Sequence, residues 1–387
     1  MGFLRSIGDY FKRTEKAYWV ILIIISGYSL LLLKTVPVNI GNRSWFVTML
    51  IAILLGYVGA IIITMVDYHD ISTFWYIISA GCLFLMLYTL KFGSAVTNSG
   101  GVDAKAWIKL GGTSFQPSEL VKIGFMITFS RHISVLEERG LLKSPLHVCL
   151  LAVHALIPII LTHMQGDDGA GVIFFCMFIA MAFGAGIQLR YFAILFAIFA
   201  CAFPIAWKYV LIDYQKQRIL AAYHLEEMDS STAVHIYGWQ QYQARTSIGS
   251  GGLLGRGLFH SPRVNLKIVP EQESDMIFSV AGEQLGFIGC FIIIVLMLLL
   301  LWQTLRIARN SSDILGRSIC MGFFGMIAAQ TIFNIGMCLD LLPVIGVTLP
   351  FFSAGGSSAA CLYFGFGLVE NVYMHPQIPT KVSIREI

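Results

Sequence analysis

The stretch Pro270-Glu271-Gln272-Glu273-Ser274-Asp275-Met276-Ile277-Phe278 marks the point where a long polar loop ends and a long apolar segment begins. It predicts that Asp275 lies where a helix meets water. Glu283, eight residues further on, is expected near the same helical face. An acidic cluster at the mouth of an apolar segment suits chemistry on a membrane-embedded substrate, and a carboxylate placed there could act as a general base.

The composition around this stretch is that of a membrane protein. Of 387 residues, 57% are hydrophobic and 12% are charged, and the mean hydropathy is +0.75. A soluble chain does not have this balance, so we expect an all-α polytopic membrane protein. Spans of about 20 apolar residues are predicted at about 17 to 34, 46 to 66, 71 to 90, 117 to 136, 146 to 164, 169 to 189, 191 to 211, 276 to 304, 315 to 338 and 350 to 371.

The fourth of these ten segments is ambiguous because it carries Glu119, Lys122 and Arg131. On hydropathy alone it could be a re-entrant or interfacial helix. Without it, the two ends of the chain would lie on opposite sides of the membrane.

The distribution of Lys and Arg predicts the orientation, because basic residues of short loops are retained in the cytoplasm. With a cytoplasmic amino terminus, thirteen basic residues are inside and five are in short outer loops. The inside set is Arg5, Lys12, Arg13, Lys16, Arg131, Arg139, Lys143, Arg190, Arg306, Arg309, Arg317, Lys381 and Arg385, and the outside set is Lys34, Arg43, Lys91, Lys105 and Lys109. We therefore expect both termini in the cytoplasm and a large extracytoplasmic loop at about 212–275, between spans seven and eight. The net charge of +4 reflects topology and does not indicate nucleic acid.

The chain is expected to be one integral membrane domain over residues 1–387. The first span follows a basic stretch without a small-residue cleavage site, which favours a retained signal anchor. The eight cysteines are scattered singly without a Cys-x-x-Cys pair, as is typical of small core residues.

Polar residues inside the apolar segments are informative because an ionisable group at membrane depth needs a partner or a function. Glu119 and Lys122 are spaced to pair on one helix face after Pro117, which suits a helix start. They are either a charge pair that permits burial or a polar wall of a substrate cavity. Asp167 and Asp168 form a sharp turn that could hold a divalent cation or a basic group, or could simply be solvated.

Two irregular segments complete the candidate site. The outer loop carries Arg218, Arg245 and the Gly-rich run from Ile248 to Gly257, which could cradle an anion through backbone N–H groups or be a flexible loop. The run from Leu342 to Ser358 contains two prolines and three glycines. Irregular backbone is tolerated at membrane depth only against protein or a water-filled cavity, so this run is expected to line a cavity.

Five motifs in this order resemble one family. They are Gln-Pro-Ser-Glu, Gln-x-Asp-x-Gly, Ile-Gly-Ser-Gly-Gly-Leu-x-Gly-x-Gly, Pro-Glu-x-x-x-Asp-x-Ile-Phe and Leu-Pro-Phe-x-Ser-x-Gly-Gly-Ser-Ser, at 116–119, 165–169, 248–257, 270–278 and 349–358. Together they resemble the SEDS proteins of the RodA, FtsW and SpoVE kind, over nearly the whole chain.

The resemblance implies a peptidoglycan glycosyltransferase of ten spans in the bacterial cytoplasmic membrane. Such a protein polymerises lipid II at the outer face beside a class B penicillin-binding transpeptidase. Asp275 matches the family's essential aspartate, and Glu119, Lys122 and Asp167 match polar positions of its motifs. The further expected substrate-binding residues are Arg218, Arg245, Glu283, Ser353 and Ser357.

The implied chemistry is an inverting displacement, because lipid II carries an α-linked diphosphate and the glycan is β-1,4-linked. Asp275 would take the proton of the acceptor hydroxyl. Charge on the leaving diphosphate would be met by Arg218, Lys122 or Arg245, or by a divalent cation such as Mg²⁺ or Mn²⁺. The apolar spans would hold the two polyprenyl tails.

The sequence departs from the family pattern at positions around the expected cavity. Gly166 and Ala170 replace the usual Pro and Thr, and Ala106 stands where a basic residue usually precedes Trp107. Arg245 replaces a small or amide residue, and Ala354 replaces Tyr. A lipid II flippase or other transporter, or a non-catalytic scaffold for a transpeptidase, remains the alternative function. The choice among elongation, division and sporulation stays open.

Overall fold

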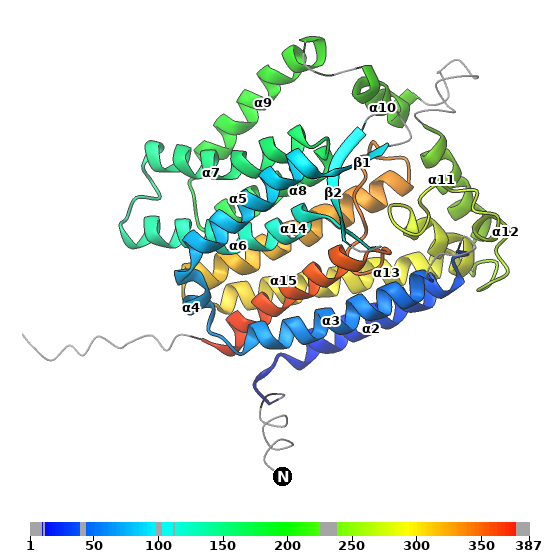
Figure 1. The fold of residues 1–387 in the computed structure, drawn as a ribbon, viewed down its shortest axis with the longest axis horizontal. Helices are drawn as coiled ribbons and strands as arrows, with labels where there is room; N and C mark the ends of the chain where they lie inside the picture. The colour runs from blue at the N-terminus through cyan, green and yellow to red at the C-terminus, as the bar shows by residue number, and fades with distance from the viewer. Residues whose placement is uncertain are drawn as a thin grey trace, which may run out of the picture.

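The computed structural model describes residues 10, 12–38, 44–97, 103–110, 113–209, 211, 213–224 and 238–376. The basic residues Arg5, Arg43, Lys381 and Arg385, used above for orientation, lie outside these ranges. Long helices run side by side and one small sheet lies at one end of them (Figure 1). The helices are α2 (Lys16–Thr35), α3 (Trp45–Thr64), α4 (Tyr68–Thr73), α5 (Trp75–Phe92), α6 (Pro117–Glu138), α7 (Pro145–Met164), α8 (Asp168–Gly184), α9 (Leu189–Tyr209), α10 (Asp213–His224), α11 (Trp239–Gly251), α12 (Pro262–Asn265), α13 (Ile277–Asn310), α14 (Ile314–Cys338) and α15 (Gly356–Met374).

Each of the ten expected spans overlaps a helix, although several boundaries differ; α8 ends at Gly184 and α13 extends to Asn310. The third segment is divided at Phe74 into α4 and α5, and the tenth begins at Gly356 because the preceding run is irregular. Within the described residues, seven helices are long and apolar enough to cross a membrane by length and composition: α2, α3, α5, α7, α9, α13 and α14. The protein is therefore an integral membrane protein.

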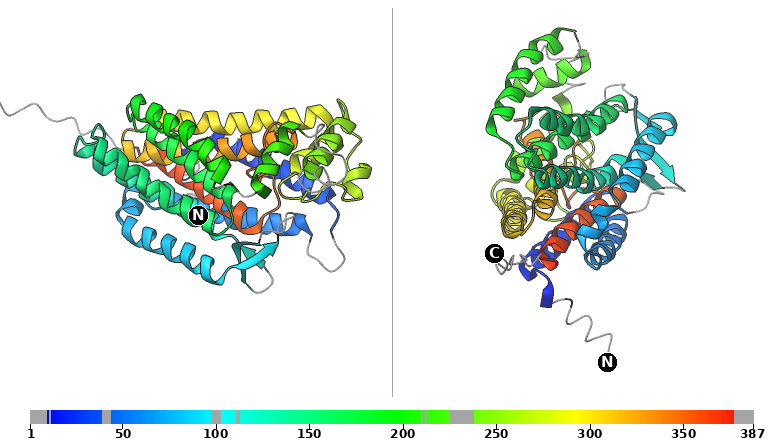
Figure 2. Two further views of the ribbon diagram at one scale, coloured as in Figure 1. Left: turned by 90° about the horizontal axis from the view of Figure 1, so that it is seen from above. Right: turned by 90° about the vertical axis from the view of Figure 1, so that its left-hand side faces the viewer.

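Helix α6 is not among these seven because it is less apolar, and other helices surround it. Most of its residues are buried, including both members of its charge pair, Glu119 and Lys122. A helix enclosed by protein can be less apolar than one that faces lipid. The opposite case is α9, which has no buried residue and lies at the top of the molecule in the right-hand view (Figure 2).

A three-stranded antiparallel sheet joins α5 to α6. Its strands are β1 (Ser94–Thr97), β2 (Asp103–Leu110) and β3 (Thr113–Phe115), in the order β1-β2-β3. The backbone of β2 is fixed to the helices because Lys105 donates its N–H to the carbonyl of Gln165, at 2.9 Å. The sheet therefore lies over the ends of α5 and α6.

Helix α13 is broken at Gly286, whose φ of 65° and ψ of −158° are not helical. The Gly-rich turn that follows α11 fills the break. The N–H groups of Arg256 and Gly257 bond to the carbonyls of Glu283 and Gln284, and the N–H of Phe287 bonds to Gly252. Backbone groups that the break would leave unpaired at membrane depth are thus satisfied.

The break lets the first part of α13 fold back along the second. The carbonyl of Phe278 lies 3.8 Å from the Sγ atom of Cys290, twelve residues further along the chain. On the neighbouring helix α14, Asn334 donates from Nδ2 to the carbonyl of Asp275 at 2.7 Å. Asp275 is therefore held beside the last turns of α14, and we refer to this side of the molecule as the Asp275 end.

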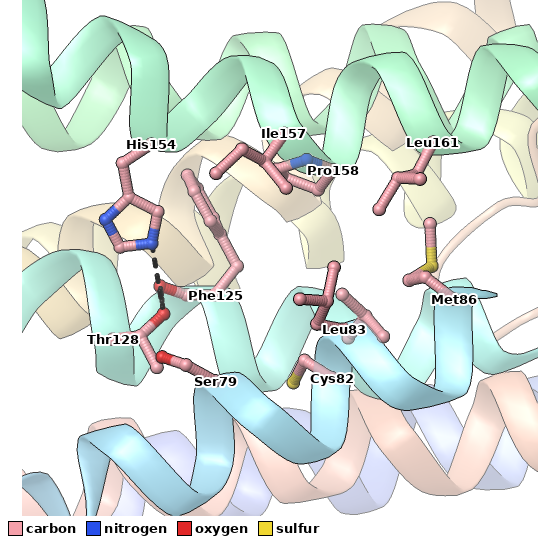
Figure 3. Close-up of a pocket in the computed structure, with 11 residues that line it drawn as sticks. Ser79, Cys82, Leu83, Met86, Phe125, Thr128, His154, Ile157, Pro158 and Leu161 are labelled. Carbon is pink, nitrogen blue, oxygen red and sulfur yellow. Dashed lines mark hydrogen bonds between the residues drawn. The ribbon is translucent and has the colours of Figure 1, made fainter.

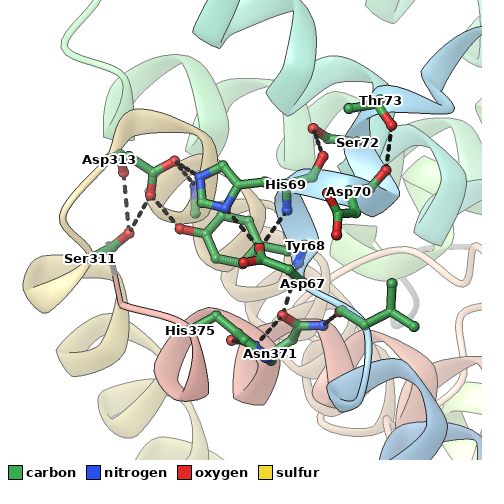
Figure 4. A network of polar contacts seen from close by, with 12 residues as sticks. Asp67, Tyr68, His69, Asp70, Ser72, Thr73, Ser311, Asp313, Asn371 and His375 are labelled. Atoms are coloured by element: carbon green, nitrogen blue, oxygen red, sulfur yellow. Dashed lines mark hydrogen bonds and ion pairs between the residues drawn. The ribbon is translucent and has the colours of Figure 1, made fainter. Parts of the chain in front are cut away.

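A polar network ties the helices together at the opposite end (Figure 4). Asp313, which caps α14, accepts a hydrogen bond from the hydroxyl of Tyr68 at 2.6 Å and lies 3.2 Å from His69. The side chain of Asn371 bonds to the backbone of Ile63, Val66 and Tyr68. The corner between α3 and α4 is thereby joined to both α14 and α15.

The break at Gly286 generates a prediction about stability. An alanine Cβ at this position would lie 2.4 Å from the backbone nitrogen of Gly255, in a conformation that is essentially restricted to glycine. We expect Gly286→Ala to cost at least about 1 to 3 kcal/mol and to lower the melting temperature in detergent. Gly81→Ala in α5 is the matched control, because a Cβ atom added there would meet no neighbouring group within 4 Å among the described residues. Equal melting temperatures for the two variants would contradict this account.

Candidate active site

Asp275 is positioned by backbone contacts on both sides of it. It precedes the first residue of α13 and is partly buried. The hydroxyl of Ser353 donates to the carbonyl of Ser274 at 2.6 Å, and the N–H of Ala354 donates to the carbonyl of Glu273 at 2.7 Å. With the bond from Asn334, three consecutive carbonyls are fixed, so the Asp275 side chain projects from a rigid turn.

The surroundings of Asp275 favour its neutral form. Burial raises the pKa of this carboxyl to about 7, and the negative charges of Glu271, Asp167 and Glu273 act in the same direction. The guanidinium of Arg218 opposes the rise. A carboxyl with a pKa near neutrality can both accept and release a proton at physiological pH, which is the property that a general base needs.

Asp167 is the second carboxylate of the site, and it is a structural cap as well. It accepts hydrogen bonds from the N–H of Ala170 at 3.0 Å, as the N-cap of α8, and from Nε2 of Gln116 at 2.7 Å. Burial raises the pKa of Asp167, while these two bonds and Lys122 lower it. Its neighbour Asp168 points elsewhere and contacts His163 and Gln215.

A narrow polar cavity of about 20 Å³ adjoins Asp167. The predicted pair is present in its wall, with Lys122 Nζ 2.8 Å from Glu119 Oε1 and both side chains almost completely buried. The cavity is covered by Gly346, Val347 and Thr348 of the irregular run between α14 and α15. A Cβ atom on Gly346 would lie 3.7 Å from Oδ2 of Asp275, so this run separates Asp275 from the cavity by one residue. The expectation that the run lines a cavity is confirmed.

The helices of the large loop hold the same run from its other side. Arg218 of α10 donates to the carbonyl of Val344 at 3.1 Å, and Gln241 of α11 donates to the carbonyl of Leu342 at 2.8 Å. Arg245, also on α11, forms an ion pair with Asp340 at 3.3 Å. Arg218 is near enough to Asp275 to influence its pKa, whereas the described contact of Arg245 is with Asp340 at the end of α14.

Other expected site residues make structural contacts in the described structure. Glu283 lies fully buried in α13 and accepts from the N–H of Arg263 at 2.9 Å, among the residues that fix α12. The Ser353 hydroxyl holds the turn before Asp275, and Ser357 Oγ accepts from the N–H of Gln116 at 3.4 Å. The N–H groups of Gly255, Arg256 and Gly257 bond to carbonyls, so the Gly-rich turn does not offer these groups to an anion.

The carboxylates present do not form a ready-made metal centre. Within the described ranges, no group of three or more His, Cys, Asp or Glu side chains is placed to hold an ion. Glu119 already pairs with Lys122, and Asp167 already accepts from two partners. These residues therefore do not fit a metal held by the protein alone.

Two amides on α14, Gln330 and Asn334, belong to the site although neither was among the expected substrate-binding residues. Gln330 lines the polar cavity, and Asn334 holds both Asp275 and Val347. Both are buried, and among the described residues neither amide oxygen has a hydrogen-bond partner. The available signal was the presence of two amides one turn apart in an apolar span, where polar groups need partners.

Comparisons with known proteins identify relatives of this chain. Escherichia coli (strain K12) peptidoglycan glycosyltransferase MrdB is 31% identical over 333 residues, which are 85% of each chain. Bacillus subtilis (strain 168) stage V sporulation protein E is 32% identical over 319 residues, or 82% of this chain and 84% of that one.

Solved structures share the fold. A chain of a peptidoglycan synthase complex, described as coordinating polymerization and crosslinking, matches 93% of this chain and 97% of its own length with a TM-score of 0.76 and 24% identity. Thermus thermophilus rod shape determining protein RodA matches 93% of this chain and 96% of its own, with a TM-score of 0.66 and 23% identity. A family model for FtsW, RodA and SpoVE, described as cell cycle protein, matches residues 15–378, and the chain belongs to that family.

Proposed function

We propose that the protein is a peptidoglycan glycosyltransferase that joins lipid II disaccharides into β-1,4 glycan strands. The observation that carries the proposal is Asp275, a partly buried carboxyl with a pKa near 7 on a rigid turn, with the Arg218 cation acting on it. The relatives named peptidoglycan glycosyltransferase support it, because the chain matches them over most of its length.

In the proposed reaction, Asp275 accepts the proton of the acceptor sugar's 4-hydroxyl. That oxygen forms a bond to the anomeric carbon of the donor, and the bond from this carbon to the diphosphate breaks. The electron pair leaves with undecaprenyl diphosphate, and the configuration inverts. Arg218, whose charge acts on Asp275, would also stabilise the departing anion. Lys122 lies in the polar cavity, on the other side of the covering run from Asp275. A divalent cation carried by the diphosphate remains compatible with this scheme, and no step depends on it.

The proposed topology has ten spans, with α6, α8 and α15 crossing in addition to the seven apolar helices. Both termini then lie in the cytoplasm, and Asp275 faces outward. The excess of basic residues in the inner loops supports this orientation. The burial of α6 and α15 supports their crossing inside a protein environment.

A class B penicillin-binding protein is the proposed partner. Support comes from the similarity to a chain of a synthase complex described as coordinating polymerization with crosslinking. The partner would crosslink the strands that this chain makes, so the outer face is the side on which the two activities must meet.

Removal of the proposed base tests the function directly. We expect Asp275→Asn to reduce glycan-strand formation from purified lipid II by about 100- to 10,000-fold, with or without the partner, because general-base help is of that size. Asp213→Asn is the control, since its side chain is 96% exposed on α10 of the same large loop. If Asp275→Asn still forms glycan strands at the wild-type rate, Asp275 is not the general base, but the proposed polymerase function stands. An absence of strands from the wild-type protein under all conditions would reject the function.

The pH profile tests the electrostatics of the site. A base must be deprotonated, so kcat/KM should fall as the pH drops through about 7, the pKa of Asp275. Glu271→Gln removes a like charge and should move this limb to lower pH. Arg218→Ala removes an opposite charge and should move it to higher pH. If the acidic limb of the kcat/KM profile stays at the same pH in both variants, a group other than Asp275 determines it.

Thiol labelling in cells tests the topology. In a variant without native cysteines, we expect Asp213→Cys to react with a membrane-impermeant reagent added outside, and Lys143→Cys to react only after the membrane is permeabilised. These two positions lie on opposite sides in the proposed arrangement, and both side chains are exposed. The reverse pattern would invert the orientation.

A further inference from the structure

An apolar groove of about 210 Å³ lies between α5, α6 and α7, away from the cavity beside Asp167 (Figure 3). Its floor is formed by buried side chains such as Met86, Val121 and Phe125, and its rim by the exposed Leu83 and Ile157. Leu83 and Ile157 are apolar side chains on membrane-spanning helices, so the groove opens toward lipid. In the hydrocarbon layer such a groove is filled by a chain and not by water.

The groove has two different ends. The end away from Asp275 is polar, where Thr128 Oγ1 lies 3.5 Å from Nε2 of His154 and His132 lies 3.2 Å from the other ring nitrogen of His154. The Asp275 end is apolar and is formed by Met86 and Leu161 (Figure 3), and Val121 in the first turns of α6 also lines the groove. A hydrocarbon chain that enters from the side is therefore expected to run toward the Asp275 end.

Exposed lysines lie beyond the apolar end of the groove. Lys91 is in the last turn of α5, and Lys105 and Lys109 are on β2, which contacts the ends of α5 and α6. The backbone of Lys105 bonds to Gln165, whose Nε2 donates to the carbonyl of Met86 in the groove wall at 2.8 Å. Lys91 and Lys105, two of the five lysines and arginines of the short outer loops, thus lie near this end, on the side where basic residues are scarce, whereas Lys109 is four residues further along the strand.

The groove also adjoins the candidate active site. Val121 of the groove is next in sequence to Lys122 of the polar cavity, so neighbouring faces of one turn of α6 serve the two sites. Gln165, which holds the groove wall, lies two residues before Asp167. The head group of a lipid in the groove would therefore lie at about the same membrane depth as the candidate active site.

We propose that this groove binds the head-group-proximal part of one polyprenyl chain, with the diphosphate held by Lys91 and Lys105. The inference rests on the proposed function, because that reaction brings two polyprenyl-linked molecules together and releases a polyprenyl diphosphate. A single-chain lipid fits a groove bounded by three helices, whereas one chain of a two-chain phospholipid would be left outside. The anionic diphosphate matches the two cations.

Binding is tested by native mass spectrometry of the purified full-length protein in detergent, with undecaprenyl diphosphate as the probe. Leu83→Trp fills the groove from α5, and we expect it to reduce the population of the bound form about tenfold. Leu87→Trp is the matched control, because Leu87 is on the same helix and 48% exposed but does not line the groove. Ile157→Trp and its control Val153→Trp repeat the comparison on α7, in case Leu83→Trp does not fold.

The head-group contact and the choice of lipid are tested in the same assay. Lys91→Gln combined with Lys105→Gln should weaken binding of the diphosphate and reduce its dependence on salt. Phosphatidylglycerol, as a second probe, should be insensitive to Leu83→Trp.

Equal binding of undecaprenyl diphosphate to the groove variants and their controls would overturn the proposal. An equal loss of both lipids would show a general site for anionic lipids and would also overturn it. This assay measures binding in the wild-type protein and in the groove variants, so binding can be judged even if no glycan strand is ever formed. A failure of this inference is thereby distinguishable from a failure of the polymerase function.

Discussion

The satisfaction of backbone groups at the Gly286 break is the constraint on which the rest of the site depends. In a bilayer, an interrupted helix leaves N–H and carbonyl groups that water cannot reach, at a cost of several kcal/mol each. Here the turn Gly252–Gly257 supplies their partners. Because the break is sealed in this way, the first part of α13 can turn back, and Asp275 comes to lie against α14.

The same arrangement explains how a carboxyl with a pKa near neutrality is held in place there. Its backbone is fixed by three bonds from α14 and from the run before α15, so little further ordering is needed when substrate arrives. Its charge is balanced between the Arg218 cation and three other carboxylates. The Arg218 guanidinium also donates to the carbonyl of Val344. This one side chain therefore affects both the pKa of Asp275 and the position of the covering run.

The amino-acid sequence predicted the helices well because apolar length is a strong signal, and each expected span has its helix. The pairing of Glu119 with Lys122 also followed from spacing alone and is confirmed. The fold-back of α13 could not be predicted, since an isolated Gly inside an apolar run does not specify a break. The pairing of the Gly-rich run could not be predicted either, because the carbonyls that accept from Arg256 and Gly257 are 27 residues away in the chain.

The roles of individual site residues were less predictable than the elements that carry them. Glu283 is near Asp275 in sequence, yet its described contact is with Arg263, because the surrounding turns of α12 enclose it. Gln330 and Asn334 lie far from Asp275 in sequence and reach the site through the antiparallel packing of α13 and α14. The substrate-binding roles expected for Arg245, Ser353 and Ser357 stay predictions.

The connection between α14 and α15 has a consequence for how such a chain can evolve. Leu349, Ser353 and Ala354 each use their backbone or hydroxyl groups in bonds that fix this segment and the turn before Asp275. Two of these bonds depend on the Ser353 hydroxyl, but the others that this segment makes use its main-chain atoms, so replacements at side chains other than Ser353 leave them intact, and Ala354 is one such replacement. The insertion or deletion of one residue would displace all of them together. The length of this connection should therefore be inherited more strictly than its sequence.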